Sequence, residues 1–144
     1  EGPHDLFAVV LHPQMEVNRC DARAVLSPTV SLKDAITQWG NLGGFIAGLY
    51  TQDYALIGRS LHDVIVEPYR KKLIPGFEEL KSVAIESGAL GAGISGAGPS
   101  IFALCEGLDK ANQVAESMKN NYQKNNIPFD LHISKINPNG VVTI

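Results

Sequence analysis

A glycine-rich stretch at residues 91–100 lies between a helical pattern and a strand pattern, and this order limits what the chain can fold into. The stretch reads Gly-Ala-Gly-Ile-Ser-Gly-Ala-Gly-Pro-Ser, with four glycines in its first eight residues. Glycine reaches positive φ angles and lets the backbone lie close to another surface. Successive N–H groups in such a loop form a concavity that binds anions. Because about two residues suffice for a tight connection, the length of this stretch favours a binding role.

Three familiar motifs nearly match this stretch, and each fails for a physical reason. The spacing of Gly91, Gly93 and Gly96 fits the dinucleotide fingerprint, which needs a strand before it and a helix after it. Here the helix pattern comes first and the strand pattern second, so no helix N-terminus would face a pyrophosphate. No lysine follows the loop, which excludes a Walker A loop. Ser95 is followed two residues later by Ala97 rather than glycine, which excludes a nucleophile elbow.

Hydrophobic periodicity predicts a single α+β domain over residues 1–144. Helices are expected, each with an apolar face, at 32–50, 54–66, 76–87 and 111–122. Strands or extended pieces are expected at 6–11, 15–20, 101–105, 129–133 and 141–144. A short helical turn at 21–26 and a reverse turn at 137–140 complete the pattern. The most economical arrangement is a ferredoxin-like sandwich, a mainly antiparallel sheet with helices packed on one face.

Composition and charge exclude several classes of protein. The 144 residues suit one domain with a core large enough to fold without metal or disulfides. The net charge is -3 and the basic residues do not cluster, which argues against a nucleic-acid partner or a polybasic membrane surface. The chain contains no run of about 18 apolar residues, so no membrane span is predicted. The four histidines lack metal-ligand spacing, so no metal site is predicted.

The two cysteines favour a reducing compartment. Cys105 lies inside the apolar run 101–105 and is expected to be a buried small hydrophobe. Two cysteines are too few for a disulfide framework, so we expect a cytoplasmic protein. No signal peptide pattern opens the chain. Because the chain starts at Glu1 and strand-like sequence follows almost at once, we expect a processed or cut start.

Several stretches together resemble a known family. The sequence Gly-Ile-Ser-Gly-Ala-Gly-Pro-Ser at 93–100, followed by Ile-Phe-Ala-Leu, resembles the third, C-terminal motif of the GHMP kinases. The stretch 63–70, which contains Glu-Pro-Tyr-Arg and leads into Leu-Ile-Pro-Gly-Phe at 73–77, is similar to the homoserine kinases of that family. So is Asp-Ala-Arg-Ala-Val-Leu at 21–26. The resemblance covers nearly the whole chain, from about Leu6 to its end.

The resemblance implies a two-half enzyme of which this chain is the second half. In the family, the N-terminal half carries the phosphate-binding loop and most of the nucleotide and magnesium contacts, and no such loop occurs in this chain. The C-terminal half resembles a ferredoxin-like α+β domain, supplies part of the acceptor site and packs its glycine loop beside the phosphate-binding loop. By itself this chain is therefore expected to be inactive, with its N-terminal domain as its partner.

The resemblance also implies substrates and site residues. ATP would be the phosphoryl donor, Mg²⁺ would bind its phosphates, and the hydroxyl of homoserine would be the acceptor, as in threonine biosynthesis. Arg23 and Arg70 match arginines that hold the amino-acid substrate, and the planar guanidinium fork suits a carboxylate. No residue is assigned as a general base. The residues expected to shape the phosphate end of the cleft belong to the glycine loop: Gly93, Ser95, Gly96 and Gly98.

Some alternatives stay open. Where a Ser-Thr pair is expected in homoserine kinases, this chain has Asn-Arg-Cys at 18–20, so a hydroxyl contact from that segment is in doubt. A different GHMP kinase, acting on a sugar or a mevalonate, is one alternative, and a non-catalytic ferredoxin-like module that binds a ligand is another. An apolar face is expected where the other half docks, which leaves open a homodimer of the isolated chain.

Overall fold

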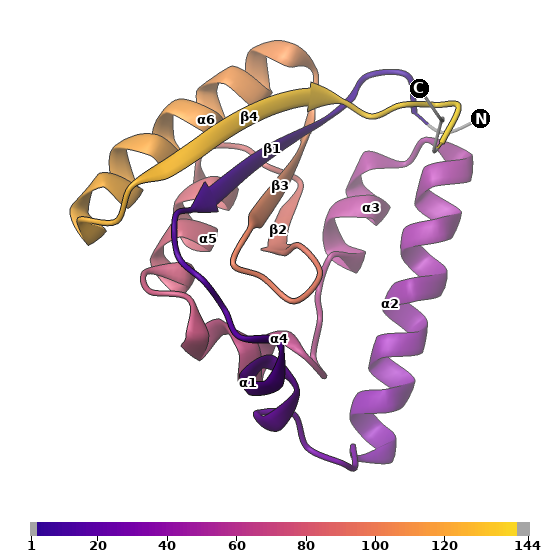
Figure 1. The fold of residues 1–144 in the computed structure, drawn as a ribbon. Helices are drawn as coiled ribbons and strands as arrows, with labels where there is room; N and C mark the ends of the chain where they lie inside the picture. Colours follow the sequence, from indigo (N-terminus) through magenta and orange to yellow (C-terminus); the bar gives the residue numbers. More distant parts are fainter. Residues whose placement is uncertain (1–2, 141–144) are drawn as a thin grey trace.

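The computed structural model describes residues 3–140 and shows a four-stranded sheet in which every neighbouring pair is antiparallel (Figure 1). The strand order is β2-β3-β1-β4. The strands are β1 (Leu6–Pro13), β2 (Gly91–Ile94), β3 (Ile101–Glu106) and β4 (Phe129–Lys135). The central strand β1 pairs with β3 on one side and with β4 on the other. The strand expected at 141–144 lies outside the described residues.

Helices fill two of the three connections between the strands, and a hairpin joins β2 to β3. They are α1 (Arg19–Ala24), α2 (Leu32–Thr51), α3 (Tyr54–Ser60), α4 (Glu67–Arg70), α5 (Phe77–Glu86) and α6 (Leu108–Tyr122), with 3₁₀ turns at Lys71–Leu73 and Gln123–Asn125. Helices α5 and α6 cover one face of the sheet, while α2 pairs with α3 to one side of it (Figure 1). The chain order β1-α5-β2-β3-α6-β4, with this strand order, is the ferredoxin-like split βαβ arrangement. The α+β prediction is therefore confirmed.

The hydrophobic core lies between the sheet and helices α5 and α6. Alternate strand residues such as Val9 and Ala103, which are register partners, are fully buried on this face. Tyr122 at the end of α6 is also fully buried, and its ring meets Phe129 edge-on with centroids 5.5 Å apart. Cys105 is buried in the same core, as its apolar neighbours predict. Within residues 3–140, no helix is long and apolar enough to cross a membrane.

Strand β2 was missed by the sequence analysis, which placed all of 91–100 in a loop. Glycine is depleted in strands, so a glycine-rich segment does not look like a strand in the sequence. In β2 the glycines allow close packing instead. A Cβ at Gly91 would lie 2.6 Å from the Leu61 Cβ, and one at Gly93 would lie 3.3 Å from Glu67 Oε2. Ala92 between them faces the core. The glycines thus let the segment 61–67 lie directly against the sheet.

Two other boundaries differ from those predicted. The helix expected at 54–66 ends at Ser60, because the Asp63 carboxylate takes the N–H groups of Ile65 and Val66 that a longer helix would use internally. The extended piece expected at 15–20 is replaced in part by α1, which begins at Arg19. Asn18 caps that helix by accepting a hydrogen bond from Cys20 N.

The two free cysteines should differ sharply in reactivity. Burial raises the pKa of Cys105 to about 11, so at pH 8 only about one such thiol in a thousand is ionised, whereas Cys20 is exposed. We expect a thiol reagent to modify Cys20 rapidly in the native chain and Cys105 only after denaturation, as read by mass spectrometry. Similar native rates at both thiols would contradict the buried position of Cys105.

Candidate functional site

Arg70, at the end of α4, joins three separate parts of the chain. Its Nε donates a hydrogen bond to the carbonyl oxygen of Ala22 in α1, at 3.1 Å. Its Nη1 donates to the carbonyl oxygen of Gly96 in the glycine loop, also at 3.1 Å. The side chain is partly buried. The structure therefore brings Arg70 and the glycine loop, which are 26 residues apart, into direct contact.

Arg23 lies in the last turn of α1, next in sequence to the residue whose carbonyl accepts from Arg70. Unlike Arg70 it is exposed. Helix α1 therefore carries one predicted arginine and anchors the other, and both belong to the same end of the molecule, where α1 and α4 meet (Figure 1).

The glycine loop is shorter than predicted and forms the tip of the β2–β3 hairpin. It is closed by Ser95 N donating to Ser100 O at 2.8 Å and by Gly98 N donating to Ser95 O at 3.0 Å. Gly96 and Gly98 have φ angles of 61° and 84°, in the region that favours glycine. Ser95 and Gly96 are exposed at the tip. The loop thus presents backbone that another molecule can approach closely.

His12, at the end of β1, fixes the other end of this loop. Its Nδ1 lies 2.7 Å from Ser100 Oγ, in a partly buried position. The sequence analysis left His12 without a role, because the contact joins residues 88 positions apart and no local spacing reports it. Ser100 immediately precedes β3, so this contact ties the loop to the centre of the sheet.

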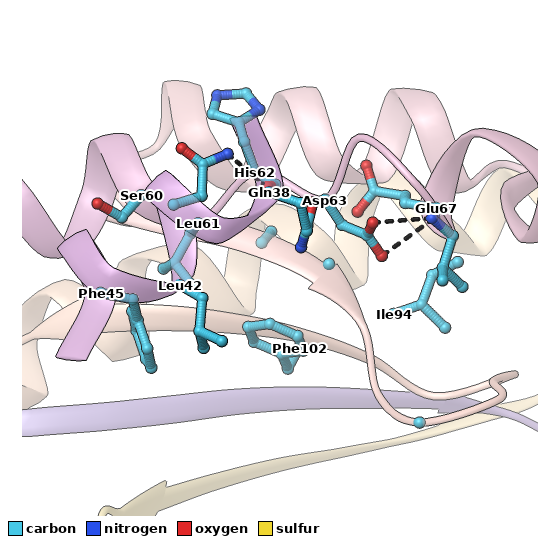
Figure 2. A pocket seen from close by; sticks show the side chains of 15 residues that line it. Gln38, Leu42, Phe45, Ser60, Leu61, His62, Asp63, Glu67, Ile94 and Phe102 are labelled. Carbon is cyan, nitrogen blue, oxygen red and sulfur yellow. Dashed lines mark hydrogen bonds between the residues drawn. The ribbon is translucent and has the colours of Figure 1, made fainter. Parts of the chain in front are cut away.

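A hollow of about 200 Å³ opens between α2, the segment 60–67 and strand β2 (Figure 2). Its lining combines apolar side chains, among them Leu42, Phe45, Ile94 and Phe102, with polar ones, among them Gln38, Asn41, Asp63 and Glu67. Gly93 and Gly96 also line it, whereas Arg23 and Arg70 do not. The glycine loop therefore borders the hollow, and the carbonyl oxygen of its Gly96 also accepts a hydrogen bond from Arg70.

Glu67 and Lys81 form an ion pair that the sequence analysis missed. Glu67 Oε1 and Lys81 Nζ lie 2.5 Å apart, with only 14% and 13% of the side chains exposed. Lys81 Nζ also lies 6.0 Å from the centre of the Phe77 ring. A pair this sheltered is costly to break, because the remaining charge stays desolvated. It ties α4 to α5 beneath the Gly93 backbone. The one sequence signal was that Glu67 belongs to the Glu-Pro-Tyr-Arg stretch.

The fold and the glycine hairpin define a class of protein. Residues 45–124 match the family described as GHMP kinases C terminal, and the chain belongs to that family. Within it, the chain is 46% identical over 136 residues to a homoserine kinase of Chlorobium phaeovibrioides, which covers 93% of this chain and 42% of that relative. A homoserine kinase of Chloroherpeton thalassium is 42% identical over 139 residues. The chain spans less than half the length of these curated relatives.

Solved structures agree with this assignment. The crystal structure of homoserine kinase from Cytophaga hutchinsonii superposes with a TM-score of 0.92 at 46% identity, over 94% of this chain and 43% of that one. A mevalonate kinase of L. major, solved in complex with R-mevalonate, reaches a TM-score of 0.68 at 14% identity. The second likeness shows a shared fold, and the first adds a close sequence relationship.

The two positive-φ glycines of the loop should differ in their tolerance of a methyl group. Both substitutions to alanine strain the backbone, but a Cβ at Gly96 meets nothing within 4 Å, whereas one at Gly98 lies 3.0 Å from Ile74 Cδ1. Ile74 is only 3% exposed and has little room to move. We expect Gly98→Ala to lower the free energy of unfolding by at least about 1 kcal/mol more than Gly96→Ala, measured by urea titration. Equal losses would mean that the loop does not pack on Ile74 as described.

Proposed function

We propose that this chain is the acceptor-side half of a homoserine kinase, which transfers the γ-phosphate of ATP to the homoserine hydroxyl in threonine biosynthesis. The observation that carries the proposal is the hydrogen bond from Arg70 to the Gly96 carbonyl, because it brings the arginine proposed to bind the carboxylate to the loop proposed to border the phosphates. Relatives about 46% identical, themselves homoserine kinases, support the choice of acceptor.

Arg70 is suited to orient the substrate. A guanidinium has five N–H donors, and its bonds to Ala22 and Gly96 use two of them. Three donors remain for a ligand, on a group whose plane is already fixed by backbone. A carboxylate bound to it gains charge-assisted hydrogen bonds without a large loss of side-chain freedom. Arg23, exposed on the neighbouring helix, is proposed as the second cationic partner of the same carboxylate.

Phosphoryl transfer depends mainly on positioning the two reactants and on stabilising charge. In this proposal Arg70 and Arg23 place the amino acid, and the exposed backbone of the hairpin tip borders the phosphates. Mg²⁺, when bound, neutralises charge on the phosphate oxygens. Among residues 3–140, no group of three or more His, Cys, Asp or Glu side chains is arranged to hold a metal. The ligands of that ion are therefore proposed to lie in the other half of the enzyme.

We further propose that an apolar face of α2 receives the N-terminal half. Large apolar side chains on this helix are exposed, including Leu32 at 71%, Trp39 at 64% and Tyr50 at 76%. Gly40 and Gly43 would have no neighbour within 4 Å of an added Cβ, so this part of the helix allows a close approach. Exposed apolar area of this extent is typical of an interface. The relatives are more than twice as long as this chain, which leaves room in them for such a half.

The proposed compartment is the cytoplasm. Both cysteines are free, Cys20 exposed and Cys105 buried. A chain that pairs no cysteines fits a reducing environment.

The first test of the proposal is Arg70→Ala in the full-length protein. Losing a charge-assisted hydrogen bond costs about 1.5–3 kcal/mol, so we expect the KM for homoserine to rise by one to two orders of magnitude with little change in the KM for ATP. Arg70→Lys keeps the charge but not the planar fork of donors, so its KM for homoserine should lie between those of the unaltered protein and Arg70→Ala. Arg59→Ala, which removes an exposed arginine of α3, is the control. An unchanged KM for homoserine in Arg70→Ala would refute the assigned role.

The second test concerns the α2 face. Hydroxyl-radical footprinting, read residue by residue by mass spectrometry, should oxidise Trp39 and Tyr50 strongly in this chain and severalfold less in the full-length protein. Leu108, 50% exposed at the start of α6, is the internal reference and should change little. If Trp39 stays equally reactive in the full-length protein, another surface receives the N-terminal half.

A further inference from the structure

Helix α4, which carries Arg70, is too short to hold its own shape. It comprises four residues, Glu67–Arg70, followed by a 3₁₀ turn. Isolated helices of this length do not form, because nucleation fixes several residues in return for one hydrogen bond. The residue at its cap position, Val66, offers no side-chain hydrogen bond. Something outside the helix must therefore satisfy its free N–H groups.

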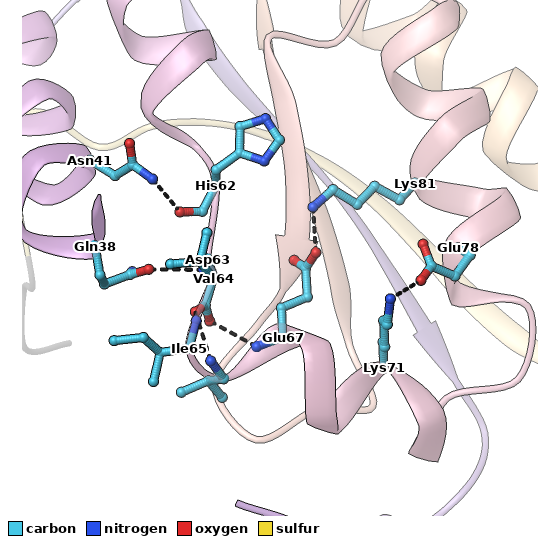
Figure 3. Close-up of polar contacts among 11 residues, drawn as sticks. Gln38, Asn41, His62, Asp63, Val64, Ile65, Glu67, Lys71, Glu78 and Lys81 are labelled. Atoms are coloured by element: carbon cyan, nitrogen blue, oxygen red, sulfur yellow. Dashed lines mark hydrogen bonds and ion pairs between the residues drawn. The ribbon is translucent and has the colours of Figure 1, made fainter. Parts of the chain in front are cut away.

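Asp63 satisfies them. Its Oδ1 accepts hydrogen bonds from Ile65 N at 2.9 Å and Val66 N at 2.8 Å, and its Oδ2 accepts from Glu67 N at 3.1 Å. Figure 3 shows this carboxylate facing the backbone where α4 begins. A carboxylate is favoured at a helix N-terminus, where unpaired N–H groups converge. Of these three donors only Glu67 N belongs to α4, and the next residue, Pro68, has no N–H. One partly buried side chain thus bonds the first N–H of α4 and the two that precede it.

Helix α2 holds the backbone on both sides of Asp63. Asn41 Nδ2 donates to the His62 carbonyl oxygen at 2.9 Å. Gln38 Oε1 accepts from Val64 N at 3.0 Å. These bonds, drawn in Figure 3, fix the residues before and after Asp63. The carboxylate is therefore placed by a twenty-residue helix rather than by the short segment that carries it.

The cap is coupled to Arg70 through a single helical turn. Arg70 N donates to Val66 O at 3.1 Å. The position of the peptide units at the cap therefore sets the position and direction of the Arg70 side chain. The side chain then reaches Ala22 O and Gly96 O. Loss of the cap would release this turn and with it the orientation of the guanidinium.

We propose that Asp63 is a positioning residue for the amino-acid substrate, acting through Arg70. This rests on the proposed function, in which Arg70 binds the substrate carboxylate. Asp63 does not touch the reacting atoms. It holds one turn of helix so that the three free donors of Arg70 are already oriented when the substrate arrives, which lowers the cost of binding.

A matched control separates positioning from simple stabilisation. Asp53 caps α3, accepting from Leu56 N at 2.9 Å, and α3 carries neither arginine of the site. Replacing either aspartate by alanine removes a helix cap. The Asp63 change removes three hydrogen bonds and the Asp53 change one, so the larger loss of stability is expected at Asp63. Only the Asp63 change should alter substrate binding.

The experiment uses the full-length protein and the variants Asp63→Ala, Asp63→Asn, Asp53→Ala, Arg70→Ala and the double variant Asp63→Ala/Arg70→Ala. We expect Asp63→Ala to raise the KM for homoserine about tenfold, Asp63→Asn to raise it less because one oxygen remains, and Asp53→Ala to leave it unchanged. The KM for ATP should stay constant. In the Arg70→Ala background, Asp63→Ala should add nothing. If Asp63→Ala does not fold, the comparison of Asp63→Asn with Asp53→Ala serves the same purpose.

Two failures are distinguishable. If Arg70→Ala itself leaves the KM for homoserine unchanged, the proposed function loses its carboxylate site. If Arg70→Ala raises that KM but the Asp63 variants do not, or if the two effects multiply in the double variant, then Asp63 does not act through Arg70 and the positioning role is wrong.

Discussion

The site depends on one side chain bonded to two backbone carbonyls. Arg70 reaches Ala22 in α1 and Gly96 in the hairpin tip, and in doing so connects segments that are 48 and 26 residues away in sequence. A guanidinium held by backbone is less free to move than one held by other side chains, and its remaining donors are already oriented. The positions of α1, α4 and the glycine loop relative to one another are consequently coupled.

Helix α2 supports the site with two different surfaces, a polar one and one that carries glycines. Polar side chains such as Gln38 and Asn41 hold the segment that leads into α4. Gly44 and Gly48 let α3 approach closely, since an added Cβ would lie 2.5 Å from Ser60 Oγ and 2.9 Å from Ile57 Cγ1 respectively. Its exposed apolar face is the one proposed to receive the N-terminal half. The weak helix propensity of a segment with several glycines is offset by packing along one side.

Much of the fold could be predicted from sequence because periodicity reports burial. The strand beginning at Leu6, the long helix capped by Ser31 and the helix of the apolar run ending at Tyr122 all follow from local pattern and capping. Strand β2 could not be predicted, because its glycines are explained by close contacts with Leu61 and Glu67. The local sequence pattern does not contain those contacts. The early end of α3 was missed because apolar periodicity alone does not report the bonds of Asp63 to Ile65 N and Val66 N.

The candidate site, like the fold, could be predicted only in part from the sequence. The glycine loop was found from its own residues and the arginines through resemblance. The structure places Arg70 against Gly96, and the roles of these residues in binding stay predictions. The roles of Lys81 and His12 depend on contacts with residues 14 and 88 positions away, and sequence spacing carries no signal for such contacts. Asp63 instead bonds N–H groups two to four residues ahead of it, a local capping pattern that the expected helix at 54–66 concealed.

The central claim is that Arg70 recognises the carboxylate of the acceptor. It is tested most directly by measuring, in the full-length protein, the affinities for homoserine and for 3-aminopropan-1-ol, which is homoserine without its carboxylate. The unaltered protein should bind homoserine at least about tenfold more tightly, and Arg70→Ala should remove most of that preference. A preference that survives intact in Arg70→Ala would contradict the account.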